Sequence, residues 1–171
     1  MASKKTWLVV VTMVLVFGMT IVENLNAQTD SRLNGTWIAT SDEIELGLML
    51  NNGNYEQSNV NRKSQRQSFI RGTYTANNGR ITFRPTQTMY IGTSATEIGL
   101  VSGRWYTVTE PEFRTTMRNF QLSLGFSEDV INLRMELFFS PQTHNYSIVS
   151  NSLILTFTFS GETATIVYTS K

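Results

Sequence analysis

The sequence predicts a mainly β protein, an up-and-down antiparallel barrel of about eight to nine strands with a two-helix insertion. Charged residues make up 16% of the chain, below the roughly 25% usual for soluble domains, which favours strands and turns over solvated helices. From Asn34 onward, short segments with a two-residue period alternate with turns rich in Asn and Gly. A closed barrel is favoured over a sandwich because closure leaves no exposed strand edge.

The length and the residue counts exclude several classes of function. A chain of 171 residues suits one domain, and its formal charge of +1 gives no electrostatic case for binding nucleic acid. The absence of Cys excludes disulfides, a Cys nucleophile and thiolate metal sites, and a single His excludes a multi-His metal site. We therefore expect a protein that is not an enzyme and has neither a cofactor nor a metal site.

Residues 1–27 have the layout of a signal peptide. Lys4 and Lys5 precede an apolar run over 7–22, which as a helix would extend roughly 24 Å, short of the ~30 Å hydrocarbon core. Cleavage after Ala27 would remove two Lys and one Glu and leave a formally neutral domain, 28–171. We expect export to the periplasm, cell envelope or medium, with membrane contact only through the leader before cleavage.

The strands are predicted from alternating apolar residues bounded by turn residues. Turns at 51–54 and 77–79 predict two hairpins, with Pro85 as the far limit of the second hairpin. The segment 89–103 is expected to form an irregular edge strand or a lid, and 61–67 a polar surface loop. Leu153, Leu155, Phe157 and Phe159 share one face of a late strand. The expected strands are 35–41, 44–50, one beginning at Tyr55, 69–76, 80–86, 105–107, 143–148, 152–159 and 163–169.

A helical period is confined to 109–139. Thr109 and Glu112 fit a capping box for a first helix, and Ser127 starts a second helix that Pro141 ends. These helices carry apolar stripes that must cover something. The stripe residues are Phe113, Met117, Phe120 and Leu124 in the first helix, and Val130, Ile131, Leu133, Met135, Leu137 and Phe138 in the second.

Several short segments, in this order along 33–171, resemble the lipocalin-like domains of exported bacterial proteins. The segments are Asn34-Gly35-Thr36-Trp37, Gly72-Thr73-Tyr74, Trp105-Tyr106 leading to Glu112, Ser140-Pro141-Gln142-Thr143, and Leu153-Ile154-Leu155-Thr156 leading to Tyr168. The leader is also similar to lipoprotein leaders, without the lipid-bearing cysteine. The resemblance implies a lipocalin-like barrel in an exported setting, with Trp37 closing the barrel floor.

The barrel interior is the candidate site, and it either holds a small apolar ligand or is filled by side chains. The candidate ligand-binding residues are Trp37, Leu48, Tyr55, Tyr74, Phe83 and Phe157. His144 begins a strand with no acid beside it, so a surface or hydrogen-bonding role is expected rather than general-base catalysis. The two functions left open are an exported module that binds an apolar ligand, and a structural or protein-interaction domain of the cell envelope. No protein partner is indicated.

Overall fold

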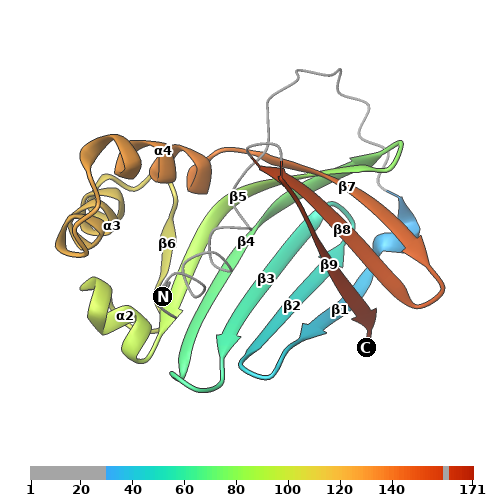
Figure 1. The fold of residues 1–171 in the computed structure, drawn as a ribbon, viewed down its shortest axis with the longest axis horizontal. Coiled ribbons are helices and arrows are strands. Elements are labelled where there is room, and N and C mark those ends of the chain that lie inside the picture. The colour runs from blue at the N-terminus through green and yellow to red at the C-terminus, as the bar shows by residue number, and fades with distance from the viewer. Residues whose placement is uncertain (1–29, 160–161) are drawn as a thin grey trace.

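The computed structural model describes residues 30–159 and 162–171, and the predicted leader lies outside these residues (Figure 1). Its elements, in chain order, are η1 Ser31–Leu33, β1 Gly35–Thr40, β2 Ile44–Asn51, β3 Asn54–Asn61, β4 Arg66–Asn77, β5 Arg80–Ile91, α2 Thr93–Ile98, β6 Trp105–Thr107, α3 Pro111–Ser123, α4 Glu128–Phe139, β7 Gln142–Val149, β8 Ser152–Phe159 and β9 Glu162–Ser170. The protein is mainly β, as the sequence predicts.

Eight of the strands form a closed antiparallel barrel. Each pairs with its chain neighbour, β7 pairs with β5, and the barrel closes where β1 pairs with β9. The short strand β6 lies outside this ring and pairs only with the far half of β5. The up-and-down order and the strand number are therefore confirmed.

Strand β5 is longer than predicted. Pro85, which was the predicted far limit of the second hairpin, lies inside the strand. The register between β4 and β5 shifts between Arg71 and Gly72, which pair with Gln87 and Pro85. Strand β5 therefore carries one extra residue at this point, which is a β-bulge. Such a bulge tolerates a residue that has no N–H to donate. At the same point β5 exchanges its neighbour, pairing with β7 over Arg80 to Phe83 and with β6 over Gln87 to Met89.

The helical part is also larger than predicted, and the described residues contain three α-helices. The segment expected as an edge strand or lid contains the end of β5 and the helix α2. Six residues are too few to display a helical period, and α2 ends at Gly99, whose φ of 84° is the left-handed conformation that Gly adopts readily. The capping box is wrong, since α3 begins after Glu110 and no side chain caps it. In Figure 1 the three helices gather on one side of the barrel, next to β5 and β6.

The end of the barrel opposite the helices is closed by a packed floor. The 3-10 turn η1 inserts Leu33 here, and the indole Nε1 of Trp37, which is 5% exposed, donates a 2.8 Å hydrogen bond to the Leu33 carbonyl. Tyr74 donates from its hydroxyl to Asn34 Oδ1 at 3.3 Å. The predicted burial of Trp37 at one end of the barrel is confirmed.

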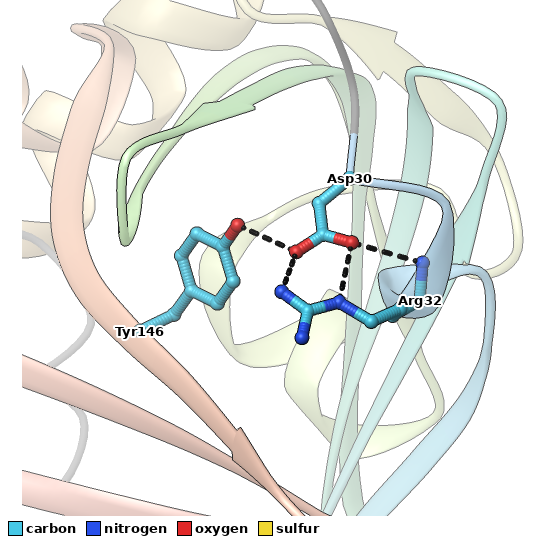
Figure 2. A network of polar contacts seen from close by, with 3 residues as sticks. All are labelled: Asp30, Arg32 and Tyr146. Atoms are coloured by element: carbon cyan, nitrogen blue, oxygen red, sulfur yellow. Dashed lines mark hydrogen bonds and ion pairs between the residues drawn. The ribbon is translucent and has the colours of Figure 1, made fainter.

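A polar network fastens the start of the described chain to β7 (Figure 2). Asp30 accepts from the Arg32 guanidinium at 2.6 and 2.9 Å, and it also accepts from the Tyr146 hydroxyl of β7 at 3.0 Å. The hydrogen bonds from Arg32 hold the pKa of the Asp30 carboxyl at about 2. The Tyr146 contact therefore joins the first described residue to a strand 116 residues further along the chain.

The helices build a second apolar cluster that packs beside the barrel mouth. Phe113 stacks on Tyr106 with ring centroids 5.4 Å apart, and Ile131 is fully buried in the same cluster. The predicted second stripe is wrong in part, because Val130 and Leu133 are 37% and 51% exposed. A helix buries the face turned toward its neighbours, and in α4 that face carries Ile131 and Met135. Within 30–159 and 162–171, no helix combines the length and the apolarity that a membrane crossing requires.

Candidate functional site

A cavity of about 280 Å³ lies between the barrel interior and the helices. The barrel is filled by side chains at its floor and is hollow beneath the helical side. The apolar and aromatic lining residues are Leu48, Tyr55, Ile70, Phe83, Pro85, Tyr90, Ile98, Met117, Phe120, Leu124, Met135, Phe138, Leu155, Phe157 and Tyr168. The polar lining residues are Gln57, Asn59, Ser68, Gln121, Arg134, Gln142 and His144.

The structure places four of the six candidate ligand-binding residues in the cavity wall, namely Leu48, Tyr55, Phe83 and Phe157. The other two, Trp37 and Tyr74, are buried in the floor and do not line the cavity. Strand alternation identifies which side chains point inward, but it does not identify their depth along the barrel axis. Depth is set by the register of each strand against its neighbours.

The surface position that was one expectation for His144 is wrong. The side chain is 4% exposed and lies among aromatic rings, with its centroid 4.3 Å from that of Phe157 and 6.1 Å from that of Phe83. Its Nδ1 is buried and has no hydrogen-bond partner. Burial lowers the pKa of His144 to about 4, so the imidazole is neutral at pH 7. Its place in the wall follows from the strand register, because His144 of β7 pairs with Ile81 of β5, whose side chain is fully buried inside the barrel.

Three further polar atoms at the cavity are buried without a hydrogen-bond partner. They are the amide nitrogen Nε2 of Gln57, the amide oxygen Oε1 of Gln121 and the guanidinium nitrogen Nη1 of Arg134. Gln121 is 9% exposed, and its amide nitrogen donates only to the Met135 sulfur at 3.5 Å. Donors and acceptors left unpaired in an apolar wall are costly to bury, and they are the groups that a ligand can satisfy.

The tyrosines of the wall are neutral hydroxyl groups. Burial raises the pKa of Tyr90 to about 12 and raises the pKa of Tyr55 and Tyr168 above their usual range. The described part of the lining contains no Asp or Glu, so its acid and base groups are a neutral imidazole, neutral phenols and one guanidinium. This set suits binding through apolar contact and a few hydrogen bonds.

The sequence analysis did not single out Gln57, Gln121, Arg134 or Gln142. A faint signal for Gln57 exists, because it continues the inward series of Tyr55 along β3, two residues further on. For Arg134 and Gln121 the helical period alone gives no reason to turn a polar residue toward the barrel. The packing of α3 and α4 over the cavity brings these residues to it.

Comparison with known proteins found no matching family model, no matching curated protein and no matching solved structure. The lipocalin-like resemblance accordingly stays a prediction from the residues quoted for it. The features of the molecule that bear on its function are therefore the cavity and the chemistry of its wall.

Proposed function

We propose that this protein is an exported, non-enzymatic lipocalin-like module that binds a small apolar ligand inside its barrel. The observation that carries the proposal is the cavity of about 280 Å³, whose wall is mostly apolar and is built jointly by the strands and the helices. Its volume is close to the lower end of the roughly 300–1,000 Å³ found for small-molecule pockets.

The size of the cavity argues against a simple packing defect. Protein interiors are close-packed, and voids much larger than one water molecule are few. An empty apolar cavity forfeits dispersion contacts along its whole wall, and removing core volume costs roughly 24 cal/mol per Å³. A ligand that fills the space would recover those contacts.

The alternative is a structural or protein-interaction domain, and one observation favours it. The outer face of α4 exposes Val130 and Leu133. Apolar side chains on one helical surface are typical of a contact with another protein. A protein that uses this surface alone would leave the cavity without a specific ligand.

Native mass spectrometry of the protein purified after export tests the proposal, followed by titration with the neutral probe 1-octanol. Ile70→Trp narrows the cavity from its wall, whereas Val167→Trp places the same ring on the exposed face of β9 and is the matched control. We expect a bound apolar compound or saturable octanol binding in the wild type and in V167W, reduced at least tenfold in I70W. A wild type that carries no compound and binds no octanol refutes the proposal and favours the structural alternative.

A further inference from the structure

Arg134 is the unusual charged residue of the helical side. It lies on α4 in the cavity wall, and its guanidinium carbon lies over the Phe126 ring, 4.2 Å from the ring centroid. Its Nη1 is buried without a hydrogen-bond partner, and within the described residues it joins no ion pair. Arg118 on the neighbouring helix differs, because it pairs with Glu128 and donates to Asn132.

The charge of the cavity wall is positive and uncompensated. Among the residues that the structure describes, the lining contains no carboxylate, and its only other basic side chain, His144, is neutral at pH 7. Partial burial lowers the pKa of Arg134, because the charged form loses hydration. A partly buried cation without a counter-ion costs free energy, and an anion bound beside it would offset that cost.

We propose that the ligand is a small amphipathic carboxylate, with its carboxylate held by Arg134 and its apolar chain lying in the barrel. This inference rests on the proposed function and names the ligand class of the same cavity. A guanidinium matches a carboxylate in shape and forms charge-assisted hydrogen bonds with it. The apolar chain would lie against Phe83, Leu155 and Phe157, which line the barrel part of the cavity.

The volume of the cavity limits the length of this ligand. A water molecule occupies roughly 30 Å³ of liquid, so 280 Å³ accommodates on the order of nine or ten groups of that size. A straight eight-carbon carboxylate has about that number of non-hydrogen atoms. Octanoate is therefore the charged probe, and 1-octanol is the neutral probe of equal chain length.

The experiment compares both probes by isothermal titration calorimetry on three proteins, each expressed with residues 1–27 so that the cell processes any leader. Arg134→Gln removes the proposed carboxylate partner. Arg114→Gln is the matched control, because Arg114 is an exposed arginine of the same helical side that lies over Phe139 and does not line the cavity. We expect the wild type and R114Q to bind octanoate about 10- to 100-fold more tightly than octanol. R134Q should lose this preference and change octanol affinity less than about threefold.

Arg134→Lys separates charge from packing, because it keeps the cation and shortens the contact with Phe126. We expect R134K to retain a preference for octanoate, and thermal unfolding confirms that each variant is folded. Octanol binding with no preference for octanoate in the wild type overturns this inference and leaves the proposed function standing. An equal loss in R134K and R134Q also overturns it, and binding of neither probe overturns both proposals.

Discussion

The buried imidazole of His144 makes the stability of the barrel depend on pH between neutrality and pH 5. The pKa of His144 falls from an ordinary 6.5 to about 4 in the folded protein because burial disfavours the charged form. As the pH drops below 6.5, the unfolded chain takes up a proton that the folded chain does not, so the free energy of unfolding decreases. This loss continues until the pH reaches the folded value and then levels off.

The magnitude follows from the two pKa values. Each pKa unit corresponds to about 1.4 kcal/mol, so the whole loss is about 3 kcal/mol, of which about 2 kcal/mol falls between pH 7 and pH 5. This is a substantial part of the 5–15 kcal/mol typical of a domain. His144 is the only His of the chain. The Asp30 carboxyl, with a pKa of about 2, stays ionised over this range.

Urea unfolding at pH 7 and pH 5, followed by tryptophan fluorescence, measures this loss in the wild type and in His144→Leu. Leu is apolar and does not titrate, so the variant should lose about 2 kcal/mol less than the wild type over the same interval. The variant should also be no less stable at pH 7, because it removes the unpartnered Nδ1 from an apolar wall. Equal losses in both proteins would show that the imidazole is hydrated in the fold, contrary to the structure.

Three further predictions concern the floor, the bulge and the leader. Trp37→Ala should lower the free energy of unfolding by about 3–5 kcal/mol in urea, because it removes a buried indole and its hydrogen bond, and a loss under about 1 kcal/mol contradicts this packing. Gly72→Ala should lower the free energy of unfolding by at least about 2 kcal/mol in the same assay, because the new Cβ would lie 2.0 Å from the Arg84 carbonyl oxygen. An unchanged free energy of unfolding would mean that β4 and β5 do not approach so closely. N-terminal sequencing of the exported protein should begin near Gln28, and a membrane-held chain that still begins at Met1 would show that the segment is an anchor.

The local pattern of the sequence was sufficient to predict most of the strands and the class of the fold. The strand 105–107 and the strand 152–159 have the predicted bounds, and the hairpin turn at 77–79 places Asn78 and Gly79 at positive φ. These features depend on the alternation of apolar residues and on turn conformation, and both are set by residues that are close in sequence. Such information is present in the sequence without knowledge of the partner strand.

Where the sequence predictions failed, the deciding contact came from elsewhere in the chain. Pro85 is an ordinary strand end by local rules, and β5 continues past it through a bulge next to it, where β5 carries one residue more than β4. The segment 93–98 is too short for its period to be recognised, and it folds as a helix that packs on β4 and β5.

The sequence by itself determined the class of the fold, the strand order of the hairpins and the inward direction of most barrel side chains. Only the tertiary structure decided that Tyr74 lies in the floor and not in the cavity wall, that His144 is buried in that wall and that Arg134 reaches the cavity from α4. The physical reason is the range of the interactions. Alternation and turns act between near neighbours, whereas depth in the barrel and the placement of helices over it depend on strand register and packing between distant segments.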